Sequence, residues 1–446
     1  MMMSWFKKLF KKKDKKVVVL GIDGVPYTLL KTFAEEGIMP NFAHIMQQGT
    51  FCSMDASIPE VSSTSWATFM TGVNPGKHNI FGFTEVQPNS YNFHFPNSND
   101  VKSETMWNIL GKHGKKSIVI NIPSTYPAKP LNGILTAGFV ALDLQKATYP
   151  HSAYEYLKSI GYKMDVDPQR AKQSLELLIE EIALTFTKRK EAILHFLKEE
   201  KWDLFIGTIT ETDRLHHFLW NAIEDREHKF HGFLINFYRD IDTLIGKINA
   251  FCGDMPFLIV SDHGFTSVKQ EVYINYWLKE NGYIKFTKYP STSLEAITTG
   301  TKAFALDPAR IYINLKGKYA RGYVNSEKEY AQLRASIQKR LLDLKVHGEP
   351  VVRNIFMKEE LYFGPYAEKA PDLVVVGKPG YDFKSYLNKT SLYGKGIFTG
   401  AHTQDNATFF INRPIEAKKI NIVDVAPTVF KLMEIEYEGF DGRPVY

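Results

Sequence analysis

The chain has 446 residues, of which 44% are hydrophobic, 13% aromatic and 23% charged. This is the composition of a globular protein without broad disorder, and the length suits one large α/β domain with insertions or two ordinary domains. The formal net charge is +6, but residues 1–16 contain seven lysines and one aspartate and so carry all of it. The rest of the chain is neutral, which argues against a nucleic-acid-binding face.

Residues 1–16 are the first expected element, a basic tail. Trp5 pairs with Leu9 and Phe6 with Phe10 at helical spacing beside the lysines, which predicts peripheral contact with an anionic membrane through residues 4–16. The alternative is a solvated charged tail. The tail lacks the uninterrupted apolar segment of a signal peptide, and no stretch of the chain approaches the roughly 18 apolar residues that span a bilayer.

The chain contains only two cysteines, Cys52 and Cys252, and each is isolated in the sequence. A disulfide framework and a paired-cysteine metal site are therefore not expected, which favours a reducing compartment. We predict a cytoplasmic protein, with the tail as a contact to the inner membrane face.

Short β-branched runs alternate with helical segments from residue 17 onwards. The first run, residues 17–24, ends in a polar loop at Asp23. Long helices are expected at 169–200 and 230–249. The alternation predicts a doubly wound α/β fold with a buried, mainly parallel sheet, whose ligands gather at the carboxyl ends of the strands. The other runs lie at residues 117–123, 203–210, 256–261, 371–376 and 407–411.

Two regions depart from this alternation. Residues 125–165 are rich in Pro, Gly and Tyr, and residues 286–365 have their own strand at 309–315 and helix at 326–344. Both are interpreted as insertions over the site, where cap elements often determine substrate choice. The predicted division is the tail, a catalytic core at 17–285 with the small insertion, a cap at 286–365, and the second part of the core at 366–446.

Three aspartates and three histidines lie next to predicted strand boundaries. Asp213 and His217 are four residues apart, so in a helix their side chains share one face. Mixed carboxylate and imidazole ligands suit Zn²⁺ or Mn²⁺ rather than Ca²⁺, and six ligands divide into two sites that each keep an open position. Taken singly, each residue has a simpler interpretation as a cap, a turn or a half-buried side chain. Together the six favour a metal centre: Asp23, Asp213, His217, Asp262, His263 and His402.

A candidate nucleophile lies in the serine-rich stretch 59–72. Polar residues precede Trp66 and Phe69, which predicts that a helix begins near Ser62 and Ser63. The free N–H groups of a helix amino terminus favour an alkoxide and a bound phosphate, and a nearby metal lowers the hydroxyl pKa. The alternative is a plain helix cap. Ser62 is the candidate, with Ser63 as its competitor.

The order of these motifs resembles the alkaline phosphatase superfamily and, within it, the type I phosphodiesterase/nucleotide pyrophosphatase family. The resemblance runs from Val17 to the end of the chain. The matching segments are GIDG (21–24), VSSTSWATFMTGVNPGKHNIFGF (61–83), TDRLHH (212–217), SDHG (261–264), GAHT (400–403), VDVAPTVFKLM (423–433) and FDGRPV (440–445).

The resemblance implies a three-layer αβα sandwich with inserted caps and two divalent metals, Zn²⁺ first and Mn²⁺ as the alternative. It implies that Asp23, Asp262, His263 and the Ser62 oxygen hold one metal. Asp213, His217 and His402 would hold the other. Ser62 would attack phosphorus to form a phosphoseryl intermediate, which water then releases.

This sequence departs from the family pattern in two places. Ser62 stands where Thr is common, a chemically equivalent change. The Asn that nucleotide pyrophosphatases place after the nucleophile is missing from Phe81-Gly82-Phe83, which argues against that particular activity, and the Cys-x-Pro-x-Arg signature of sulfatases is absent.

The predicted function is hydrolysis of phosphodiester or pyrophosphate bonds in a small-molecule or lipid-linked phosphate ester. The first alternative is a phosphomonoesterase or phosphomutase with the same site. The second is an inactive, membrane-tethered interaction protein. The sequence leaves the oligomeric state open.

Overall fold

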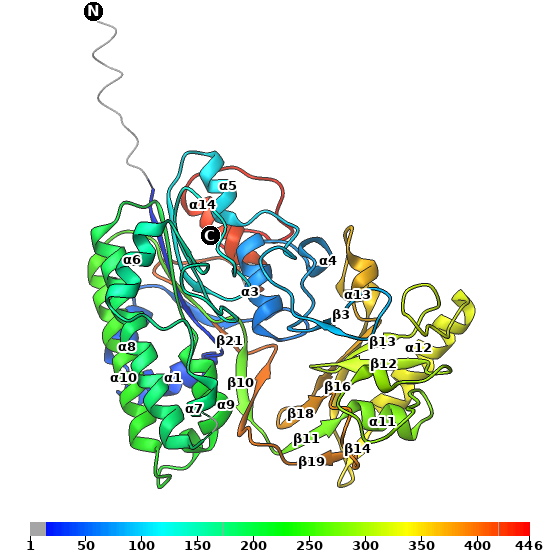
Figure 1. Cartoon of the computed structure of the whole chain (residues 1–446). Coiled ribbons are helices and arrows are strands. Elements are labelled where there is room, and N and C mark those ends of the chain that lie inside the picture. The colour runs from blue at the N-terminus through cyan, green and yellow to red at the C-terminus, as the bar shows by residue number, and fades with distance from the viewer. Residues whose placement is uncertain (1–14, 172, 418) are drawn as a thin grey trace, which may run out of the picture.

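The computed structural model describes residues 15–171, 173–417 and 419–446 (Figure 1). Its centre is an eight-stranded sheet in which five neighbouring strands, β9, β1, β8, β5 and β6, run parallel. The antiparallel strands β21 and β7 pair with the two ends of this parallel set. In spatial order the strands are β2 (Thr50–Met54), β21 (Ala407–Ile411), β9 (Phe257–Val260), β1 (Val17–Ile22), β8 (Leu204–Ile209), β5 (Ser117–Ile122), β6 (Gly133–Ala137) and β7 (Thr148–Tyr149).

Helices cover both faces of this sheet. Strand β1 is buried along its whole length: Val18, Leu20 and Ile22 face one hydrophobic core, while Val17 and Val19 face the other. Burial on both faces explains why the strand sequence is a continuous apolar run rather than an alternating one. The predicted three-layer α/β sandwich is confirmed.

Each layer of helices is made of segments far apart in sequence (Figure 1). The first layer contains α1 (Tyr27–Glu35), α2 (Pro40–Met46), α6 (His151–Ser159), α8 (Leu175–Glu199), α9 (Glu211–Glu224) and α10 (His231–Cys252). The second layer contains α3 (Ser62–Thr71), α5 (Met106–Lys112) and α14 (Val425–Leu432).

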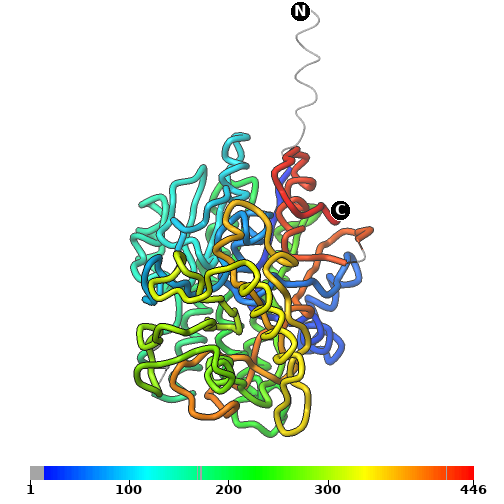
Figure 2. Tube along the Cα trace, turned by 90° about the vertical axis from the view of Figure 1, so that its right-hand side faces the viewer, coloured from blue at the N-terminus to red at the C-terminus, as the bar shows by residue number. Residues whose placement is uncertain are grey.

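A second body, called the cap here, faces the viewer in Figure 2. A two-stranded ribbon, β10 (Gly264–Ser267) with β20 (Gly400–Thr403), joins it to the core. The cap contains an antiparallel sheet of β12 (Ala303–Leu306), β13 (Arg310–Ile313), β17 (Leu373–Gly377) and β16 (Val352–Met357). A three-stranded sheet has the order β18 (Tyr381–Lys384), β11 (Gln270–Tyr273) and β19 (Tyr393–Gly394). The cap helices are α11 (Ile274–Glu280), α12 (Glu327–Leu342) and α13 (Lys358–Leu361).

Two predicted strands take other places than the sequence indicated. The run 371–376 forms β17, which pairs antiparallel with β13 and β16 in the cap rather than joining the central sheet. The run 407–411 forms β21 in the central sheet, but antiparallel to β9. A short apolar run reveals that a strand is buried, but not which sheet it joins or in which direction.

Helix and insertion boundaries also differ from the sequence prediction. The helix expected at 169–200 is divided into α7 (Pro168–Ala171) and α8, where Ser174 caps the amino end by accepting a hydrogen bond from the Leu177 N–H. The expected insertion at 125–165 contains β6 and β7, which extend the central sheet. The expected cap at 286–365 lies within the cap observed between β10 and β20, and its exact limits stay a prediction.

The chain enters the described region at the amino end of β1. Lys15 lies 3.5 Å from Glu434, and the Lys16 ammonium lies 4.7 Å from the centre of the Trp202 ring. Residues 4–14 of the predicted membrane-binding segment lie outside the described residues. Within the described part of the chain, the helices are too short or too polar to cross a membrane.

Candidate active site

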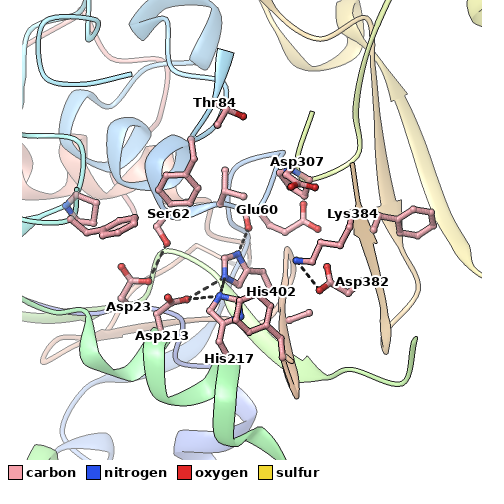
Figure 3. Close-up of a pocket in the computed structure, with 18 of the residues that line it drawn as sticks. Asp23, Glu60, Ser62, Thr84, Asp213, His217, Asp307, Asp382, Lys384 and His402 are labelled. Carbon is pink, nitrogen blue, oxygen red and sulfur yellow. Dashed lines mark hydrogen bonds and ion pairs between the residues drawn. The ribbon is translucent and has the colours of Figure 1, made fainter. Parts of the chain in front are cut away.

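The predicted site residues meet at the carboxyl edge of the central sheet, and Figure 3 shows five of them: Asp23, Ser62, Asp213, His217 and His402. Asp23 directly follows β1, and Asp262-His263 follow β9. Asp213 and His217 lie one turn apart on α9, which begins after β8, and His402 lies on β20 of the ribbon. Parallel strands bring these loops to one edge, as expected for this class of sheet.

Asp23, Asp262 and His263 form the first group, and potential ligand atoms of all three lie within 4.8 Å of one another. The Asp262 Oδ1 accepts a hydrogen bond of 3.0 Å from the Gly24 N–H. Its Oδ2 is buried and accepts no hydrogen bond from the described residues, although the His263 Nε2 is 3.3 Å away. A buried oxygen without a hydrogen-bond donor fits a position reserved for a cation.

The pKa values of the first group also indicate a position for a cation. Burial, with repulsion from Asp262 and Asp213, raises the pKa of Asp23 well above its usual value. Burial also raises the pKa of Asp262 to about 7. Carboxylates held this close in a low dielectric resist ionising together unless a cation compensates them. The residues present therefore fit a divalent metal.

Asp213, His217 and His402 form the second group, again with ligand atoms within 4.8 Å. The His402 Nε2 lies 3.2 Å from Asp213 Oδ1 and 3.0 Å from His217 Nε2. The Nδ1 atoms of the two rings face backbone carbonyls, at 3.2 Å for His217 and Gly400, and at 2.8 Å for His402 and Glu60.

These carbonyl contacts determine which ring nitrogens are free. A carbonyl can only accept, so both Nδ1 atoms carry the hydrogen, and in neutral rings both Nε2 atoms present lone pairs to the same point. Burial lowers the pKa of His217 to about 3, which keeps that ring neutral. Two facing lone pairs beside the Asp213 carboxylate match a metal site of mixed nitrogen and oxygen ligands.

Ser62 begins α3 and is the serine that contacts the first group. Its Oγ lies 3.2 Å from Asp23 Oδ1 and 3.1 Å from His263 Nε2. The His263 Nδ1 faces the Gly264 carbonyl, so His263 Nε2 is free to accept a hydrogen bond from the serine. The neighbouring Ser63 Oγ is buried without a hydrogen-bond partner among the described residues, and Ser63 does not line the cavity.

A cavity of about 470 Å³ lies between the core and the cap, and its lining includes Ser62, Asp23 of the first group and all three residues of the second group. Sequence reasoning missed its two cations, Arg214 and Lys384. Arg214 lies in the TDRLHH segment next to a predicted ligand, and this position could have marked it. Lys384 comes from β18 of the cap, and no signal in its surrounding sequence indicated that it reaches the site. Aromatic walls include Phe83, Phe95, Phe139, Tyr386 and Phe398.

Arg214 is held in place by two groups outside the metal-ligand set. Its guanidinium lies 2.8 Å from Asp165 Oδ2 and 4.2 Å from the centre of the Phe139 ring. Asp165 and Phe139 both lie in the insertion predicted over the site, and Phe139 lines the cavity, so that segment contributes to its wall.

Comparison with known proteins finds matches over most of the chain. Residues 17–405 match the sequence model of the type I phosphodiesterase / nucleotide pyrophosphatase family. No curated protein matches. Among solved structures, phosphonoacetate hydrolase from Sinorhizobium meliloti 1021 superposes with a TM-score of 0.65 and 14% identity, over 94% of this chain and 95% of that one. Murine ectonucleotide pyrophosphatase / phosphodiesterase 5 superposes with a TM-score of 0.57 and 13% identity, over 96% of this chain and 97% of that one. At such identities the structural likeness establishes the fold alone.

Proposed function

This chain belongs to the type I phosphodiesterase / nucleotide pyrophosphatase family and is a hydrolase of phosphoric ester bonds, and we propose that it cleaves phosphodiesters with Ser62 as the nucleophile and two divalent cations. Asp23, Asp262, His263 and the Ser62 oxygen would hold one cation. Asp213, His217 and His402 would hold the other. Zn²⁺ suits these ligands best, with Mn²⁺ as the alternative. Bound there, the metals lower the pKa of the serine hydroxyl and offset charge on the entering and leaving oxygens.

One observation supports the metal centre above the others. The Nε2 atoms of His217 and His402 lie 3.0 Å apart, with each Nδ1 facing a carbonyl. With both rings neutral, neither Nε2 carries a hydrogen, so the two imidazoles cannot hydrogen-bond to each other. Without a metal, one ring must carry a proton here: burial opposes the charge, but the hydrogen bond and the charge of Asp213 raise the pKa of His402. A shared cation would take the place of that proton.

The chain's own residues would prepare Ser62 for attack. The α3 backbone places Oγ toward Asp23 and His263, and the free N–H groups at the start of this ten-residue helix favour negative phosphate oxygens. The Ser62 hydroxyl gives its proton to water, and a bond forms between Ser62 Oγ and phosphorus while the bond from phosphorus to the leaving oxygen breaks with its electron pair on that oxygen. Attack by water on the phosphoseryl group then restores the serine.

The charges around the cavity favour a diester over a monoester. Arg214 and Lys384 are its only Lys or Arg lining residues in the described part of the chain. Each already faces a carboxylate 2.8 Å away, Asp165 for Arg214 and Asp382 for Lys384. The two cations are therefore compensated and add no net positive charge to offset the extra negative charge of a monoester, whereas a diester carries one charge less.

The test is a metal analysis combined with a substrate pair. The purified protein is assayed with Zn²⁺ or Mn²⁺ on bis(4-nitrophenyl) phosphate and on 4-nitrophenyl phosphate, for the wild type, Ser62→Ala and the matched control Ser63→Ala. We expect bound metal, faster turnover of the diester, and loss of activity in Ser62→Ala only. Preference for the monoester would favour a phosphomonoesterase or phosphomutase. Undetectable metal, or full activity in Ser62→Ala, would favour the inactive interaction protein.

Cytoplasmic location and membrane contact through residues 4–16 are further parts of the proposal. The tail joins the amino end of β1, whereas Asp23 follows the carboxyl end, about 20 Å away for six extended residues. The tail therefore joins the core at the edge opposite the cavity. Co-sedimentation with anionic liposomes tests the contact, and equal binding by a chain starting at Lys16 would refute it.

A further inference from the structure

Lys384 reaches from the cap into the cavity on the side of the second ligand group (Figure 3). Its ammonium lies 5.5 Å from the centre of the Phe398 ring, and that ring lies 4.8 Å from the imidazole of His217. A single aromatic side chain therefore separates the lysine charge from a candidate metal ligand.

The surrounding cap residues hold Lys384 in this position. The Lys384 Nζ lies 2.8 Å from Asp382 Oδ2, and only 16% of the side chain is exposed. The backbone of the next residue, Ser385, is held on both sides: its N–H donates to Asp307 at 2.5 Å, and its carbonyl accepts from the Asn275 side chain at 2.6 Å. A side chain anchored in this way loses little conformational freedom when it binds a ligand.

Lys384 is charged at neutral pH and has N–H donors that do not face Asp382. Burial opposes its charge, but the carboxylates of Asp382 and Asp307 raise the pKa of Lys384 to about 12. An ammonium has three N–H donors, and Asp382 faces one of them. The remaining donors are available to an oxygen in the cavity.

In-line displacement determines on which side of phosphorus the leaving oxygen lies. The entering oxygen, Ser62 Oγ, lies against Asp23 and His263 of the first group. Because the entering and leaving oxygens stand on opposite sides of phosphorus, the leaving oxygen must lie on the side of the second group. Lys384 is the lysine that lines this side of the cavity.

We infer that Lys384 donates a hydrogen bond to the leaving oxygen and thereby allows cleavage of esters with poor leaving groups, such as those of aliphatic alcohols and unsubstituted phenols. This inference rests on the proposed function. The bond from phosphorus to oxygen breaks with its electron pair passing to the leaving oxygen, and the proton stays on Lys384 Nζ. The alkoxide or phenoxide then takes a proton from water.

The test is a series of methyl aryl phosphodiesters whose aryl group varies from 4-nitrophenyl to phenyl, so that only the leaving group changes. The metal-loaded wild type is compared with Lys384→Met and with Lys395→Met, an exposed cap lysine that does not line the cavity. In Lys384→Met we expect kcat/KM to fall less than about threefold for 4-nitrophenyl and roughly ten- to hundredfold for phenyl, as suits one charge-assisted hydrogen bond to a developing anion. Lys395→Met should behave as the wild type.

A second variant separates this role from a structural one. Lys384→Met alone leaves the Asp382 carboxylate buried without its partner, so the double variant Lys384→Met/Asp382→Asn removes both charges together. Thermal unfolding and metal content are recorded for each protein. An equal loss for every leaving group in the double variant, or no loss, would overturn the role of Lys384. A wild type that is inert on the whole series would instead refute the proposed function, and the inference with it.

Discussion

Replacement of Asp262 by Asn should stabilise the metal-free protein while abolishing its metal-dependent activity. The Asp262 Oδ2 is buried and lacks a hydrogen-bond donor among the described residues. Burial raises the pKa of this carboxyl to about 7, from 3.8 in the unfolded chain. Asparagine keeps the Oδ1 that accepts from Gly24, removes the charge, and adds an N–H that can face the Asp23 carboxylate.

The size of the effect follows from the two pKa values. Between pH 3.8 and 7 the folded protein keeps a proton on Asp262 that the unfolded chain has lost, so the contribution of Asp262 to the free energy of unfolding falls as the pH rises through this window and is constant above it. The cost of the buried charge is on the order of 4 kcal/mol at pH 8 and well below 1 kcal/mol at pH 4. The free energy of unfolding of Asp262→Asn should exceed that of the wild type by about that much at each pH.

Urea unfolding of the chelated proteins at pH 8 and pH 4 measures the gain. Added Zn²⁺ should then stabilise the wild type, because the folded state alone presents the assembled site, and should stabilise Asp262→Asn much less. A chelated variant that is no more stable than the chelated wild type at pH 8 would refute the reasoning, since Asp262 would then bear no uncompensated charge.

Three further changes test the fold around the site. Burial lowers the pKa of His78 to about 3, so the unfolded chain binds its proton first, and the contribution of His78 to the unfolding free energy should fall by about 2 kcal/mol from pH 8 to pH 5; in urea titrations the difference between the wild type and His78→Gln should change by that amount over this range. Arg189→Met breaks a fully buried ion pair with Glu211 and should lower the free energy of unfolding by about 3–5 kcal/mol. The double variant Arg189→Met/Glu211→Gln should lose less; an equal loss in the single and double variants would show that the two side chains are not coupled. Gly72→Ala places a Cβ on left-handed backbone and against Phe440. The free energy of unfolding should therefore fall by about 1–2 kcal/mol or more, and the melting temperature should drop with it; an unchanged melting temperature would contradict this.

Local sequence spacing predicted how neighbouring side chains of one helix lie. The four-residue spacing of Asp213 and His217 placed both on one face of a helix, and in α9 the His217 Nε2 lies 3.4 Å from Asp213 Oδ1. The polar-to-aromatic change after Val61 predicted where α3 begins, which places Ser62 rather than Ser63 at the first group. These features depend on one helix turn, which short-range patterns describe.

Features that depend on how distant segments pair were not predictable in the same way. His263 and His402 are far apart in sequence, yet their rings stack with centres 3.6 Å apart, because β10 and β20 pair in the ribbon. The motif order indicated that both belong to the site, but not this contact. The placement of β17 in the cap and the position of Lys384 at the cavity likewise depend on how distant strands pair and in which register. The local sequence around each strand does not determine that pairing.

The most direct test of the central claim is to trap the covalent intermediate. The metal-loaded protein is mixed with bis(4-nitrophenyl) phosphate, quenched in acid during turnover, digested, and examined by mass spectrometry, with Ser62→Ala treated in parallel. We expect the substrate's phosphoryl moiety on Ser62 in the wild type and none in the variant. Turnover by the wild type with unmodified Ser62 throughout, or with the phosphoryl moiety on Ser63, would contradict the claim.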